Sequence, residues 1–129
     1  KQSDVTCRGH AIEVRICAED PAKSFFPAPG QVGDLRVPGG PGVRFDSLLF
    51  PGYTIPPFYD SLIGKLIVWA EDREHAIERL KRALGELRVG GLKTTKPLFA
   101  ALADDGDVRA GKVHTGWLEG WLEQNASRL

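Results

Sequence analysis

The chain has 129 residues, of which 42% are hydrophobic and 26% charged, and its 17 basic and 17 acidic residues give a formal net charge of zero. This composition is that of one soluble globular domain, and it excludes an intrinsically disordered chain. The balanced charge argues against a nucleic-acid or anionic-lipid surface, and the longest apolar stretch, over residues 62–70, is too short to span a membrane.

The number of cysteines and the lack of methionine indicate where the protein is located and whether the chain is complete. Only Cys7 and Cys17 are present, too few for a disulfide framework or a zinc site, so we expect free thiols and a cytoplasmic location. The three histidines lie far apart in the sequence, and no metal site is expected. Because the chain has no methionine, even at position 1, we expect a single domain over residues 1–129 that is a fragment of a longer protein.

Strands are predicted in the first half of the chain. Residues 11–17 alternate between apolar and polar side chains, which predicts a half-buried strand with Glu13 and Arg15 together on its polar face. A loop with several prolines follows over 18–30. Further strands are expected over 31–37, 43–50 and 62–69, the last of them central because its apolar run is nearly continuous.

After residue 70 the apolar spacing changes to the helical period. Helices are predicted over about 72–88, over about 95–103 and from 115 onward. Thr95 and Thr115 are the expected N-caps of the second and third helices, and Trp117 and Trp121 are expected in the core. Strands followed by helices predict an α+β fold, with a mostly antiparallel, barrel-like β-sheet and two to three helices packed on it.

General catalytic motifs are absent from the sequence. It has no phosphate-binding glycine loop before a helix, no G-x-S-x-G and no H-E-x-x-H. Arg15 remains as a candidate, because a guanidinium that is held by a carboxylate can direct its N–H groups toward an anionic oxygen. Taken alone, an arginine on a half-buried strand is more often an ordinary surface residue than a catalytic one.

Four sequence blocks resemble the C-terminal domain of biotin carboxylases. They are G-H-A-I-E-V-R-I-C-A-E-D-P over 9–21, F-P-A-P-G over 26–30, P-G-G-P-G-V-R-F-D-S over 38–47 and Y-T-I-P-P-F-Y-D-S-L-I-G-K-L over 53–66. The helical part is similar as well, through 76–87 and 91–94. The blocks follow the family's order with similar gaps, and the resemblance covers residues 4–123.

The resemblance implies that the chain completes the active site for ATP- and bicarbonate-dependent carboxylation of carrier-bound biotin. It makes Arg15 the catalytic residue, which contacts the ureido oxygen of biotin and the neighbouring bicarbonate or phosphate and stabilises the biotin enolate. It places Asp60 in the same biotin and bicarbonate vicinity. Arg44 and Pro41 are implied at a homodimer interface, where Pro41 replaces an aromatic residue of related sequences and indicates a weaker or different dimer.

The resemblance also implies cofactors and partners. ATP and Mg²⁺ are held mainly by an ATP-grasp domain that precedes this segment in the family, so no cofactor is expected on the fragment, which we expect to be inactive alone. The expected partners are that ATP-grasp domain, a biotin carboxyl carrier and a carboxyltransferase, as in the acetyl-CoA carboxylase of fatty acid biosynthesis or in pyruvate and urea carboxylases. The sequence does not indicate which acyl acceptor the parent enzyme serves.

Alternatives stay open at this point. Other ATP-grasp ligases, including purine-pathway carboxylases, carry a small β-rich C-terminal domain, although the blocks at 13–20 and 56–65 favour biotin carboxylase. A non-catalytic docking or dimerisation module would require Arg15 to be dispensable. A biotinyl carrier domain is excluded, because its modified lysine stands beside a methionine. Glu13 is expected to orient Arg15 or to pair across the sheet, and Lys65 to extend to solvent.

Overall fold

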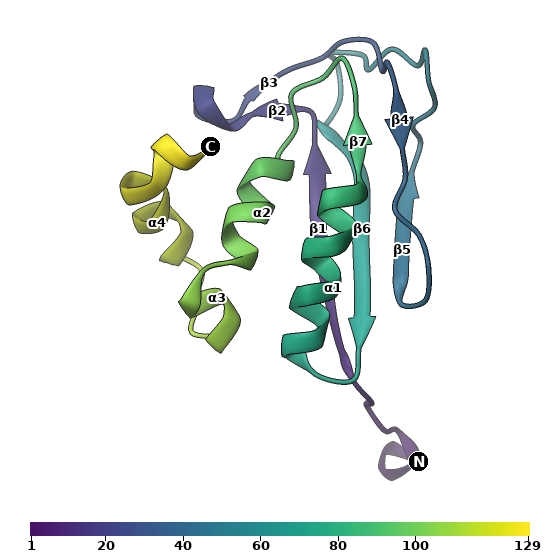
Figure 1. Cartoon of the computed structure of the whole chain (residues 1–129), viewed down its shortest axis with the longest axis vertical. Coiled ribbons are helices and arrows are strands. Elements are labelled where there is room, and N and C mark those ends of the chain that lie inside the picture. The colour runs from purple at the N-terminus through teal and green to yellow at the C-terminus, as the bar shows by residue number, and fades with distance from the viewer.

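The computed structural model describes all 129 residues, and its centre is a three-stranded antiparallel sheet (Figure 1). The strand order is β1 (His10–Cys17), β6 (Leu62–Ala70) and β5 (Val43–Ser47). β6 lies between the other two strands, as its continuous apolar run predicts. Its register places Lys65 opposite Arg15 on one side and opposite Asp46 on the other.

Helix α1 (Arg73–Glu86) covers one face of this sheet (Figure 1). The side chain of Asp72 begins the helix by accepting a hydrogen bond from the backbone N–H of His75 at 2.9 Å. The apolar face of the helix packs on the alternating apolar residues of β1 and β6. The core formed in this way includes Val14, Ile16, Leu66, Val68, Ile77, Leu80, Ala83 and Leu84.

The expected barrel-like closure of the sheet is wrong. The remaining strands form two separate two-stranded sheets, which pair β2 (Glu19–Asp20) with β3 (Phe26–Pro27) and β4 (Leu35–Arg36) with β7 (Arg88–Val89). The strand expected over 31–37 is therefore much shorter, and the strand expected over 43–50 ends at Ser47. The sheet stays open because the free edge of β1 faces the start of helix α2 instead of a further strand.

Four α-helices are present where two to three were expected. After α1 come α2 (Lys96–Ala103), α3 (Gly106–Ala110) and α4 (Trp117–Asn125). The unexpected α3 is a short turn of helix that Asp105 caps with hydrogen bonds to two backbone N–H groups. The N-cap of α4 is Gly116 and not the expected Thr115. Short 3₁₀ turns occur at Gln2–Asp4, Pro21–Lys23 and Ala126–Arg128.

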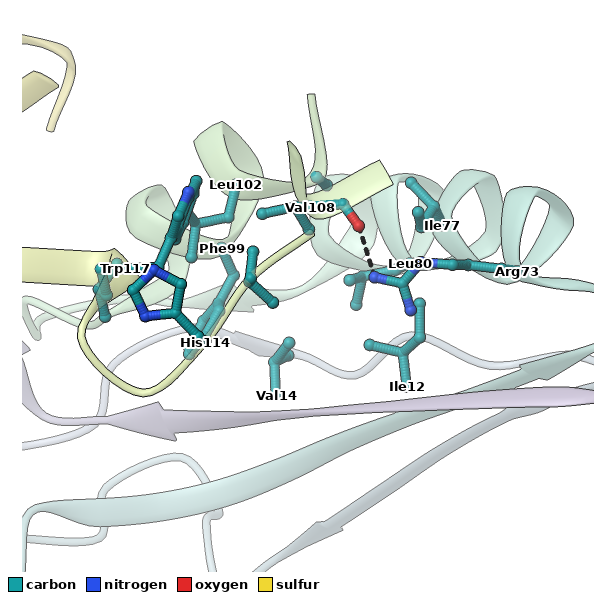
Figure 2. A pocket seen from close by; sticks show the side chains of 13 residues that line it. Ile12, Val14, Arg73, Ile77, Leu80, Phe99, Leu102, Val108, His114 and Trp117 are labelled. Atoms are coloured by element: carbon teal, nitrogen blue, oxygen red, sulfur yellow. Dashed lines mark hydrogen bonds between the residues drawn. The ribbon is translucent and has the colours of Figure 1, made fainter. Parts of the chain in front are cut away.

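The C-terminal helices enclose an apolar cavity of about 290 Å³ against the helix-covered face of β1 (Figure 2). Ile12 and Val14 point into it from the strand, and Trp117 lies at its α4 end. Arg73 lines the cavity and donates hydrogen bonds to the carbonyls of Val108 and Arg109, the last turn of α3. Since the strand alternates, Arg15 points away from this cavity to the opposite face.

Candidate active site

Arg15 lies on the face of the sheet that no helix covers. Its strand neighbours Val14 and Ile16 are buried in the core, so the alternation of β1 directs the Arg15 side chain outward. The side chain is 53% exposed, and its Nη2 atom lies 3.4 Å from Oδ2 of Asp60. The two residues proposed for one site from the sequence are therefore neighbours in the structure.

Asp60 has two roles at the start of β6. Its Oδ1 atom accepts a hydrogen bond from the backbone N–H of Leu62 at 3.1 Å, which fixes the carboxylate at the point where the strand begins. Its Oδ2 atom is then left to face Arg15. A guanidinium with one N–H group directed at a carboxylate keeps its other donors available for an anionic ligand.

Behind this pair lies a polar cluster that the sequence did not predict. Ser61 donates a hydrogen bond to the carboxylate of Glu19, and its carbonyl accepts one from Ala18 at 2.7 Å. Cys17 is adjacent, and burial raises the pKa of its thiol above the ordinary value, so the thiol is kept protonated. The contact joins the segment after β1 to the segment before β6, and it holds Arg15 and Asp60 at the same end of the sheet.

Glu13 pairs across the sheet and does not orient Arg15. Its Oε1 atom lies 3.9 Å from Nζ of Lys65 on the neighbouring strand. Lys65 is in register with Arg15, so two cationic side chains stand side by side on the uncovered face. Lys65 is also 43% exposed, as expected for a lysine that extends to solvent. Together with Asp60, this row places two cationic and two anionic side chains on the uncovered face, paired as Arg15 with Asp60 and Lys65 with Glu13.

Arg44 and Pro41 lie apart from the Arg15–Asp60 pair. Arg44 is on β5 and makes a two-pronged ion pair with Asp46, with distances of 2.8 Å from Nε to Oδ1 and 2.6 Å from Nη2 to Oδ2. This hydrogen-bonded guanidinium lowers the pKa of Asp46. Pro41 is exposed in the turn before β5, and β5 begins with Val43 opposite Val68, near the end of β6, whereas Asp60 precedes the start of β6. Neither residue contacts the candidate site within this chain.

A hollow of about 280 Å³ adjoins the site. Asp60 and Ser61 line it together with Tyr59 and a group of prolines, namely Pro27, Pro29, Pro56 and Pro57. Tyr59 is 84% exposed, so the hollow has an exposed aromatic ring in its lining beside Asp60. No group of three or more His, Cys, Asp or Glu side chains in the chain is placed to hold a metal ion. The candidate site thus offers the half-exposed guanidinium of Arg15 beside the carboxylate of Asp60.

A family model described as the biotin carboxylase C-terminal domain matches residues 13–120. The chain belongs to this family. The matched region includes both residues of the candidate pair, Arg15 and Asp60. The alternative assignment to another ATP-grasp ligase is not favoured.

The curated proteins that resemble the chain include biotin carboxylases. It is 51% identical over 118 residues to the biotin carboxylase of a Nostoc species, and 51% identical over 118 residues to one of the subunits of pyruvate carboxylase from Methanothermobacter thermautotrophicus. Each comparison covers 92% of this chain, but only 26% and 24% of those proteins. The chain thus spans about a quarter of the length of the curated relatives that it matches.

Solved biotin carboxylase structures share the fold. The biotin carboxylase domain of a thermophilic 2-oxoglutarate carboxylase, bound to bicarbonate, superposes with a TM-score of 0.92 at 44% identity, over 98% of this chain and 28% of that one. The dimer of such a domain from Hydrogenobacter thermophilus, in complex with MgADP, ADP and bicarbonate, gives a TM-score of 0.91 at 44% identity. That comparison covers 96% of this chain and 27% of the other.

None of the helices in this structure has the length and apolar character that a membrane span requires.

Proposed function

We propose that this chain supplies the C-terminal wall of the active site in a full-length biotin carboxylase, where carrier-bound biotin is carboxylated at the expense of ATP and bicarbonate. The observation that carries the proposal is the half-exposed guanidinium of Arg15, held through one nitrogen by Asp60. Similar domains are bound to bicarbonate and to MgADP, which supports the same small-molecule set for the parent of this chain.

In this proposal Arg15 acts by electrostatic stabilisation. Carrier-bound biotin would give its ureido N–H proton to the phosphate released from carboxyphosphate, and its nitrogen would then take up the CO2 released with that phosphate. Negative charge would gather on the ureido oxygen between the two steps. A fixed guanidinium beside the oxygen stabilises that charge without having to reorganise. Asp60 keeps the guanidinium in place, while Lys65 on the adjacent strand adds to the positive potential of the same face.

The nucleotide belongs to the part of the enzyme outside this chain. The residues described here include no glycine-rich loop before a helix and no acidic cluster suited to Mg²⁺. We propose that ATP and Mg²⁺ bind to the ATP-grasp domain, and that the 129-residue chain alone does not hydrolyse ATP. Biotin-dependent ATP hydrolysis by the isolated chain would contradict this part of the proposal.

The proposed partners follow from the same assignment. They are the ATP-grasp domain of the parent protein, a biotin carboxyl carrier and a carboxyltransferase. We also propose a homodimer in which Arg44 and Pro41 lie at the contact, because both are exposed and face away from the core of this chain. The dimeric biotin carboxylase domain of Hydrogenobacter thermophilus supports the formation of a dimer.

The test compares the full-length wild-type enzyme with Arg15→Ala. We expect biotin carboxylation to fall by about 10²- to 10³-fold, the effect of removing one preorganised donor from an oxyanion. Arg36→Ala is the matched control, since Arg36 is exposed on β4 and outside the site, and it should keep the wild-type rate. A folded Arg15→Ala enzyme with the wild-type rate would instead make this domain a docking or dimerisation module.

A further inference from the structure

Thr95 is a buried polar residue whose hydroxyl does not serve the helix that it precedes. It occupies the N-cap position of α2 and is 5% exposed, yet its side chain caps no backbone group of that helix. The hydroxyl instead reaches β1. Its oxygen accepts a hydrogen bond from the N–H of Cys17 at 3.0 Å, and its proton is donated to the carbonyl of Arg15 at 3.0 Å. The expected capping role of this side chain is therefore wrong.

These two hydrogen bonds satisfy backbone groups of β1 that a neighbouring strand would otherwise pair with. β1 is an edge strand of the sheet, and the Arg15 carbonyl and the Cys17 N–H belong to its free edge. A third hydrogen bond, from the N–H of Thr95 to the carbonyl of Cys17 at 3.1 Å, completes the attachment. One residue at the start of α2 thus satisfies three backbone groups of the strand, which would otherwise be costly to bury.

Thr95 bonds to β1 at the point where the pairing of β1 with β6, along its other edge, is irregular. The pairing of β1 with β6 shifts register between Ile16 and Cys17, so the ladder on that side is interrupted just after Arg15. The Arg15 side chain itself has a single polar partner, Asp60, at the long distance of 3.4 Å. The direction of the guanidinium therefore depends strongly on the backbone at residues 15–17, and Thr95 fixes that backbone.

We propose that Thr95 is a positioning residue for catalysis, whose hydroxyl holds the Arg15 segment of β1 so that the guanidinium meets the anionic oxygen of the substrate. The inference rests on the proposed role of Arg15. It adds a residue at the free edge of β1 that bonds only to the backbone of the strand and contacts no reacting group. Loss of the hydroxyl should lower kcat, because a catalytic group displaced by a fraction of an ångström loses transition-state contact.

The experiment is a double-mutant cycle in the full-length enzyme, with Thr95→Val, Arg15→Ala and the double variant. Thr95→Val keeps the shape of the side chain and removes the hydroxyl, and we expect a fall in kcat for biotin carboxylation of about 10- to 100-fold. In the Arg15→Ala background the same substitution should have little further effect, because the group that it positions is gone. Thr95→Ser, which keeps the hydroxyl, should restore most of the rate.

Matched variants separate this role from a loss of stability. Thr94→Val removes a neighbouring hydroxyl whose one hydrogen bond, to the N–H of Lys96, is 3.4 Å long, and it should keep the wild-type kcat. If Thr95→Val does not fold, Thr95→Ala takes its place in the cycle with the same expectations. Circular dichroism and thermal unfolding of each variant establish that the rates belong to folded protein.

The outcomes distinguish the two proposals. A wild-type rate for Arg15→Ala overturns the proposed function, and the positioning role with it. A large loss for Arg15→Ala together with a wild-type kcat for the Thr95 variant overturns the positioning role alone. Equal losses from the Thr95 substitution in both backgrounds also overturn it, since they show an effect that does not pass through Arg15.

Discussion

Arg15 and Asp60 lie 45 positions apart in the chain, and their side chains meet at 3.4 Å between Nη2 and Oδ2. The contact is possible because β1 ends where β6 begins, so the last residues of one strand face the loop that leads into the other. Both side chains are more than half exposed, and ion pairs of this kind add little to stability. Under the proposed function, the contact with Asp60 serves to orient the guanidinium of Arg15.

The first prediction separates orientation from folding. Asp60→Asn keeps an oxygen that can accept from the N–H of Leu62 but removes the charge that attracts Arg15. We expect the Tm of the chain to fall by no more than about 4 °C, because an exposed ion pair contributes about 0–1 kcal/mol. The kcat of biotin carboxylation in the full-length enzyme should fall by about 10-fold. Asp34→Asn, which removes an exposed ion pair with Arg88 outside the site, is the control.

The second prediction concerns the turn after β7. Gly91 has a φ of +82°, and a Cβ atom there would lie 2.6 Å from the carbonyl oxygen of Gln31. Because that oxygen belongs to the backbone, Gly91→Ala should destabilise the chain by about 1–3 kcal/mol. Gly85 lies inside α1 with open space around it, so Gly85→Ala should stabilise by about 0.5–1 kcal/mol. Chemical denaturation measures the free energy of unfolding of both variants. Changes of the same sign and size would contradict the difference in space around the two glycines.

The third prediction is a pH window for the start of α1. The hydrogen bond from the His75 N–H lowers the pKa of Asp72 below 3.8, and the hydrogen bond with the Asp72 carboxylate raises the pKa of His75 above 6.5. The Asp72 contribution to stability is present above its unfolded pKa and is lost as pH falls through the lower folded value. The His75 contribution is present below its unfolded pKa and is lost as pH rises through the higher folded value.

Both contributions are thus present together between about pH 3.8 and 6.5. The difference in Tm between the wild-type chain and His75→Gln should be largest in this window and should shrink as the pH rises above 6.5 and through the raised pKa of His75. His114→Gln removes an exposed histidine without an ion pair, and its Tm difference should not follow this profile. A His75 difference that grows toward alkaline pH would reverse the expected sign.

The fourth prediction uses the two thiols as probes. Cys7 is exposed, whereas Cys17 is half-buried and burial raises its pKa, so little thiolate forms there. With iodoacetamide at about pH 8, we expect Cys7 to be alkylated at least about 10-fold faster than Cys17 in the folded chain. Peptide mass spectrometry measures both rates, and in denaturant the two should become similar. Equal labelling of the folded chain would show that the end of β1 opens readily.

The elements with strong local periodicity were predictable from the sequence. The alternation through β1 gave the outward direction of Arg15, the apolar run gave the central place of β6, and the helical period gave α1 with little error. Each of these predictions depends only on which side chains face the core, and the spacing of apolar residues within one segment shows that. The closeness of Arg15 and Asp60 came instead from resemblance to a family, because no local pattern encodes a contact across 45 positions.

The errors arise where tertiary contacts compete with local rules. Thr95 has the residue type of a helix cap, but its hydroxyl finds partners on β1 that cannot be known before the sheet is assembled. The barrel-like closure fails for the same reason, since the edge of β1 is already occupied by the start of α2. The short helix α3 contains only five residues, too few for a periodic pattern to be recognised.

The order of the strands also has a consequence for synthesis of the chain. β1 pairs only with β6 in the central sheet, and the 44 residues over 18–61 separate Cys17 from its partner Leu62. At about 5–20 residues per second, roughly 2–9 s pass between the end of β1 and the first residue of β6. Until β6 has been made, Val14 and Ile16 have no partner strand beside them, so this part of the core forms late in the synthesis of the domain.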